Sequence, residues 1–133
     1  KRSEFDFSFS GLKTAILYTC KKMTSNELVE NRSDIAASYQ EAIIDTLLQK
    51  LKKVHLKTNI SKISVAGGVA ANSRFREKAN EVSEKLGLNI HFPKMELCTD
   101  NAAMIAMAGY ERLQIGEQST LDLPVIPNLS LAG

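Results

Sequence analysis

The sequence predicts an α/β fold in three layers, with parallel strands joined by a helix. The first observation behind this prediction is a strand–helix–strand order: an apolar segment at 60–66, an amphipathic segment at 72–86 and an alternating segment at 88–93. The second is the pair Gly67 and Gly68, placed where the first strand gives way to the helix. Strands joined in this way are parallel, and the crossover between them is right-handed.

The composition is that of one globular domain with a core of ordinary size. The chain has 133 residues, 44% of them hydrophobic, and its formal net charge of +2 does not by itself indicate a nucleic-acid partner. We find neither a signal peptide nor an apolar run of roughly eighteen residues. The two cysteines, Cys20 and Cys98, lack the spacing of a metal site. We therefore expect a cytoplasmic protein with two free, buried thiols.

The N-terminal part predicts a strand, a helix, a loop and one long helix. Phenylalanines alternate with polar residues over 5–10, which is typical of a strand with one buried face. After a short helix, a polar loop is expected over 24–33. Apolar residues then recur at intervals of three and four over 35–54, which predicts the longest helix, capped by Ser33 or Asp34.

The C-terminal part predicts one further helix and a tail. Gly87 is placed to end the helix at 72–86. A helix beginning at Asp100 is apolar nearly all round, so we expect it to be buried on several sides. Prolines in the last residues favour an extended tail over 119–133, which leaves 1–118 as the folded lobe.

The loops that follow the two strands of the unit, 67–72 and 93–100, are expected to share one cleft. Ligands of open α/β sheets bind outside the carboxyl ends of the strands, and parallel strands place these ends side by side. Gly67 and Gly68 allow a ligand to approach the backbone, and the start of the next helix favours negative charge. A nucleotide fits this description. A tight turn without a ligand is the alternative.

Three blocks of the sequence carry a resemblance to a known family. FSFSGLKTA at 7–15, GGVAAN at 67–72 and CTDNAAMIA at 98–106 resemble, in order and spacing, the signature blocks of the tRNA threonylcarbamoyladenosine transferase family, formerly called glycoproteases. The resemblance covers essentially the whole chain, which corresponds to the C-terminal part of a family member. It implies an actin-like ATPase fold of the ribonuclease H-like type, of which this chain would form much of the second lobe, with a mixed sheet.

The resemblance also implies an activity. Family members move a threonylcarbamoyl group from threonylcarbamoyl-AMP to N6 of the adenosine next to the anticodon, in tRNAs that read codons beginning with A. The residues implied to bind threonylcarbamoyl-AMP or ATP are Gly67, Gly68 and Asn72, and the implied ligand of one divalent metal, iron or else zinc or magnesium, is Asp100. The implied partners are tRNA, a related inactive paralogue subunit and a small ATPase. No catalytic residue is implied.

Asn72 and Asp100 each have a structural alternative, because each precedes a predicted helix and has a side chain suited to an N-cap. If Asp100 binds metal, Thr99 is expected to take over the cap. The family's histidine pair, four residues apart, is missing, since the two histidines of this chain are His55 and His91. We therefore expect the chain by itself to be free of metal and inactive in threonylcarbamoyl transfer.

Other classes of function remain as alternatives. A nucleotide-binding kinase of the same architecture would use a similar glycine turn. A metallopeptidase, the older description of the family, needs a motif such as H-E-x-x-H, which the sequence lacks. The third alternative is a non-catalytic interaction module.

Overall fold

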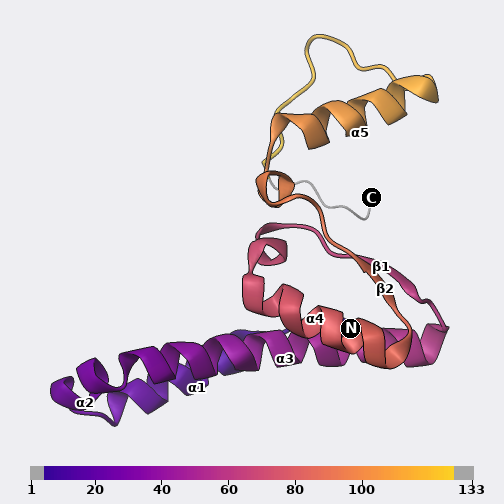
Figure 1. Ribbon diagram of the computed structural model, residues 1–133. Helices are drawn as coiled ribbons and strands as arrows, with labels where there is room; N and C mark the ends of the chain where they lie inside the picture. Colours follow the sequence, from indigo (N-terminus) through magenta and orange to yellow (C-terminus); the bar gives the residue numbers. More distant parts are fainter. Residues whose placement is uncertain (1–4, 128–133) are drawn as a thin grey trace. The chain divides into compact units, whose positions relative to one another are not determined.

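The computed structural model describes residues 5–127 and divides the chain into two compact units, with the boundary between Cys98 and Thr99 (Figure 1). The boundary falls before residue 118, the predicted end of the folded lobe. The two units are described separately.

Three helices begin the first unit: α1 (Ser10–Lys21), α2 (Ser25–Glu30) and α3 (Arg32–Thr58). The last of these has 27 residues and is the longest helix of the described chain, as predicted. Both α1 and α2 pack along α3 (Figure 1). Asn59 ends α3 in the left-handed conformation, with its N–H bonded to the carbonyl of His55.

The predicted strand at 5–10 is wrong. Residues 6–9 form neither helix nor strand, and α1 already begins at Ser10. The rings of Phe7 and Phe9 stack with their centroids 5.9 Å apart. A strand requires a hydrogen-bonded neighbour, and no segment within 5–127 pairs with this one. The alternation of phenylalanines therefore reflects a pair of stacked rings.

The predicted loop at 24–33 is also wrong, because α2 lies within it. The Thr24 hydroxyl accepts a hydrogen bond from the N–H of Glu27, and the Glu27 carboxylate accepts one from the N–H of Thr24. This capping box stabilises the start of a helix whose residues are mostly polar. The helix α3 then follows with Asn31 at the N-cap position, so neither Ser33 nor Asp34 caps it.

The strand–helix–strand unit is confirmed. It consists of β1 (Lys62–Ser64), α4 (Ser73–Leu86) and β2 (Asn89–His91), and the two strands are parallel with Ile63 opposite Ile90. Gly87 ends α4 with φ at 64° and its N–H bonded to the carbonyl of Ser83. Each strand is shorter than predicted. The described residues contain this two-stranded sheet and no further strand, so they do not include a mixed sheet.

The core of the first unit lies where α3, α4 and the sheet meet. The apolar face of α4 buries Phe75, Ala79 and Val82 against Ile44 and Leu48 of α3. The isoleucines of both strands pack against the same cluster, and the ring of Phe92 meets that of Phe75 edge to face at 5.7 Å. The helix α4 is therefore held from two sides, by a long helix and by the sheet.

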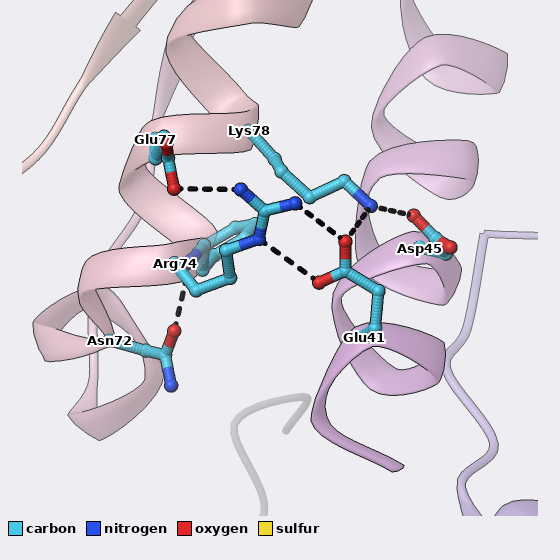
Figure 2. A network of polar contacts seen from close by, with 7 residues as sticks. Glu41, Asp45, Asn72, Arg74, Glu77 and Lys78 are labelled. Atoms are coloured by element: carbon cyan, nitrogen blue, oxygen red, sulfur yellow. Dashed lines mark hydrogen bonds and ion pairs between the residues drawn. The ribbon is translucent and has the colours of Figure 1, made fainter. Parts of the chain in front are cut away.

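An ion-pair network also joins α4 to α3 (Figure 2). Arg74 donates to both carboxylate oxygens of Glu41, at 3.2 and 2.8 Å, and to Glu77 at 2.7 Å. Lys78 donates to Glu41 at 2.8 Å and also to Asp45. The hydrogen bonds from Arg74, and next those from Lys78, lower the pKa of Glu41 from 4.5 to about 2.

The second unit contains α5 (Ala102–Gln114), which begins two residues later than predicted. None of its residues is buried, although its sequence predicts burial on several sides. The exposed apolar side chains include those of Met104, Ile105 and Met107. Burial on several sides needs several neighbouring elements, and the described part of the second unit has α5 as its one helix.

No helix between residues 5 and 127 combines the length and the apolar character needed to cross a membrane.

The network around Glu41 makes stability depend on pH. Because the folded-state pKa is about 2 and the ordinary value is 4.5, the contribution of ionised Glu41 is fully present above pH 4.5 and is lost as the pH falls through about 2. We expect Glu41→Gln to lower the melting temperature at pH 7, and its deficit relative to the wild type to shrink between about pH 4.5 and about pH 2.

Thermal unfolding followed by circular dichroism across this pH range measures the difference. The control is Glu84→Gln, which removes an exposed carboxylate from α4, the helix that pairs with Glu41, and for which no comparable deficit is expected. A Glu41→Gln deficit that is independent of pH would contradict the assignment.

Candidate functional site

The glycine turn (residues 67–72) follows β1 and leads into α4. Gly67 has φ at 83°, in the left-handed region that favours glycine, and a short 3₁₀ helix, η1 (Gly68–Ala71), separates it from Asn72. The α-helix itself begins at Ser73, next to the predicted start at residue 72, and the turn of 3₁₀ helix lies before it. A Cβ atom added at Gly67 or Gly68 would meet no atom within 4 Å, so the backbone is open there.

Two backbone donors of this turn have no acceptor among residues 5–127. The N–H of Ala70 bonds to the carbonyl of Gly67, and that of Asn72 bonds to the carbonyl of Val69. The N–H groups of Gly68 and Val69 bond to no described atom. They lie at the start of η1, where unpaired N–H groups favour an anionic ligand.

Asn72 is the N-cap of α4. Its side-chain oxygen accepts a hydrogen bond from the N–H of Phe75 at 2.9 Å, and its side-chain nitrogen donates to Gln40 of α3 at 2.9 Å. The structural alternative for Asn72 is thus what the structure shows. An amide has two donor hydrogens and two acceptor lone pairs, so each end of the side chain retains capacity for a ligand.

A cavity lies between α3 and the glycine turn. Its volume of about 430 Å³ is in the range of small-molecule sites. Gly68, Val69 and Asn72 line it from the turn, and Tyr39, Gln40 and Ile43 are among the residues that line it from α3. Gly67 is not part of the lining. Two of the three predicted nucleotide-binding residues therefore face one hollow.

The second loop (residues 93–98) is joined to the glycine turn through Arg76. The guanidinium of this α4 residue donates to the carbonyl of Ala70 at 2.6 Å, to that of Pro93 at 2.7 Å and to the sulfur of Cys98 at 3.4 Å. It also lies 4.9 Å from the centre of the Phe92 ring. The two loops therefore lie close together as far as Cys98, but no residue of the second loop lines the cavity beside the glycine turn, so the shared cleft stays a prediction.

The two cysteines differ in burial. Cys98 is a free thiol with 1% of its surface exposed, and its sulfur donates to the carbonyl of Lys94 at 3.4 Å. A short 3₁₀ helix, η2 (Met95–Leu97), separates these residues. The predicted burial is correct for Cys98, but Cys20 is also free and only partly buried.

Asp100 is exposed and lies in the second unit. It does not cap α5, because Asn101 does so by accepting a hydrogen bond from the N–H of Met104 at 3.1 Å. Thr99 does not cap it either. No three His, Cys, Asp or Glu side chains within 5–127 are grouped closely enough to hold a metal ion. One exposed carboxylate does not fit a metal site, so any such site needs further ligands from outside residues 5–127.

Comparison with known proteins identifies the family. Residues 1–107 match the family model described as tRNA N6-adenosine threonylcarbamoyltransferase. Proteins with this name are 49% identical in Kosmotoga olearia, over 98% of the chain, and 48% identical in Thermosipho africanus, over 96%. In Cytophaga hutchinsonii the identity is 42% over 97% of the chain. The chain spans 38% of the length of each of these relatives. It therefore belongs to the tRNA N6-adenosine threonylcarbamoyltransferase family.

Proposed function

We propose that the chain is part of an enzyme that transfers a threonylcarbamoyl group from threonylcarbamoyl-AMP to N6 of the adenosine next to the anticodon of tRNA. The observation that carries this proposal is the family membership, because the name of the relatives states transfer to N6 of adenosine in tRNA. The acceptor tRNAs are those that read codons beginning with A. The chain by itself is proposed to be inactive, since it spans 38% of its relatives.

The contribution of this chain is to bind and orient a nucleotide, either threonylcarbamoyl-AMP or ATP. The unpaired N–H groups of Gly68 and Val69 would donate to an anionic oxygen of the ligand. Gly67 permits close approach, because it carries no Cβ and its backbone faces open space. Asn72 would use the spare capacity of its amide for a ribose or phosphate oxygen. Supporting this arrangement, the cavity beside α3 is large enough for a ligand of this class.

The partners proposed for the complete protein are tRNA, a related inactive paralogue subunit and a small ATPase. A tRNA substrate also implies a protein of the cytoplasm. The lobe of an actin-like ATPase with a mixed sheet is likewise proposed for the complete protein. In support, the described part is a helix-rich α/β unit with a parallel strand pair.

Asp100 is proposed as one ligand of a divalent metal in the complete protein, with iron favoured over zinc or magnesium. Because the carboxylate is exposed, it could bind a metal ion together with ligands supplied by the remaining part of the protein. The absence of a capping role for Asp100 supports the proposal, because a capping carboxylate would already be engaged by backbone N–H groups.

The nucleotide proposal is tested by Asn72→Ser in the complete protein. Serine retains an N-cap oxygen but removes the amide and its hydrogen bond to Gln40, so the melting temperature is expected to fall only slightly. The affinity for ATP is expected to fall about two- to tenfold, which corresponds to the loss of one hydrogen bond to the ligand. Isothermal titration calorimetry measures the affinity.

The matched control is Asn101→Ser, because Asn101 caps α5 with the same type of hydrogen bond. This control should leave the affinity for ATP unchanged. Equal affinity for ATP in Asn72→Ser and the wild type would show that the role of Asn72 is purely structural.

The metal proposal is tested by elemental analysis of the complete protein. Asp100→Asn preserves the shape of the side chain but removes its charge, so the metal content is expected to fall well below one ion per chain. Glu96→Gln, which changes another exposed carboxylate of the preceding segment, should retain the metal. Full metal content in Asp100→Asn would show that Asp100 is not a ligand.

A further inference from the structure

Arg76 links the glycine turn to the second loop. One guanidinium donates to the carbonyl of Ala70 in η1 and to the carbonyl of Pro93 in the second loop. The same group reaches the buried sulfur of Cys98 at the end of that loop. The side chain itself comes from α4, which the core holds in place. A single residue on a fixed helix thus contacts both loops at once.

The shape of the guanidinium is required for these contacts. Its donors are spread over a rigid, planar fork, so Nε can bond to Ala70 while Nη2 bonds to Pro93. The Phe92 ring, 4.9 Å from the guanidinium carbon, supports the same group through a cation–π contact. A lysine would keep the positive charge, but its compact ammonium could not reproduce the fork.

The contact with Ala70 bears on the donors of the glycine turn. In a short helix the free N–H groups lie at one end and the free carbonyl groups at the other. Arg76 holds a carbonyl of η1, whereas Gly68 and Val69 at the opposite end carry the unpaired N–H groups. Fixing the carbonyl therefore limits the rotation of the whole turn and of its donors.

We infer that Arg76 is a positioning residue, which locks the glycine turn to the second loop and holds the N–H groups of the turn in the geometry that receives the anionic part of a nucleotide. Nε and Nη2 of its guanidinium are engaged by backbone carbonyl groups of the two loops, so the role assigned to Arg76 is exerted through the turn. The inference rests on the nucleotide site proposed above. It adds a residue that lies outside the three blocks through which the family was recognised.

Hydrogen exchange in the complete protein, without any ligand, tests whether Arg76 holds the glycine turn to the second loop. The reporters are amides that are hydrogen-bonded within the two loops, namely those of Ala70, Asn72, Leu97 and Cys98. In Arg76→Ala and Arg76→Lys these amides are expected to exchange at least about tenfold faster, because loss of a charged hydrogen bond favours local opening. Arg74→Ala and Arg74→Lys are matched controls, since Arg74 bonds to Glu41 and Glu77 and to neither loop.

Calorimetric titration with ATP tests the consequence for the ligand. Arg76→Lys is expected to bind ATP at least about tenfold more weakly than the wild type, although it keeps the charge, while Arg74→Lys binds normally. Arg76→Lys also covers the case in which Arg76→Ala does not fold. Unchanged exchange and unchanged affinity in Arg76→Lys would each overturn the inference while leaving the proposed function intact. Failure of the wild type to bind ATP would instead overturn the nucleotide site, and the exchange rates would still decide whether the lock exists.

Discussion

Burial of one face of α4 is the constraint on which the first unit depends. Successive residues of an α-helix point about 100° apart, so a helix held along one face directs its other residues to fixed neighbours. Phe75 enters the core, Arg74 turns towards Glu41 of α3, and Arg76 turns towards the two loops. Three consecutive residues thereby attach α4 to the core, to α3 and to the two loops. The cap at Asn72, and with it the glycine turn, takes its position from this helix.

The elements that the sequence predicts correctly are those with a local physical cause. The apolar stripe of α3 and the glycine that ends α4 act within their own segments, so the periodicity and the residue type are sufficient. The parallel pairing of β1 and β2 follows from the helix between them. By contrast, the segment at 5–10 alternates like a strand, but a strand also needs a partner that the pattern does not reveal. The capping box of α2 was readable as Thr24 followed by Glu27, and the polar composition concealed it.

The candidate site was also predicted only in part. Gly67, Gly68 and Asn72 were predicted from a sequence block, and the structure adds an open backbone, two unpaired donors and a cavity. Arg76 was not predicted, because its main acceptors are backbone carbonyl groups, and every residue type supplies a carbonyl. No pattern of side chains could have identified that contact. The metal site shows the opposite limit: Asp100 stands out in a sequence block, but residues 5–127 contain no group of side chains that could complete a coordination sphere around it.

The open position of α5 has a chemical consequence. The side chains of Met104 and Met107 have 49% and 57% of their surface exposed, so peroxide can reach both thioethers without any local unfolding. Oxidation would convert two apolar groups into polar sulfoxides. On a helix surrounded by water, this change would leave the backbone largely undisturbed. On a helix covered by another part of the protein, the same two oxygens would have to enter a packed apolar contact. The rate at which these two methionines are oxidised in air therefore reports how much of α5 is covered.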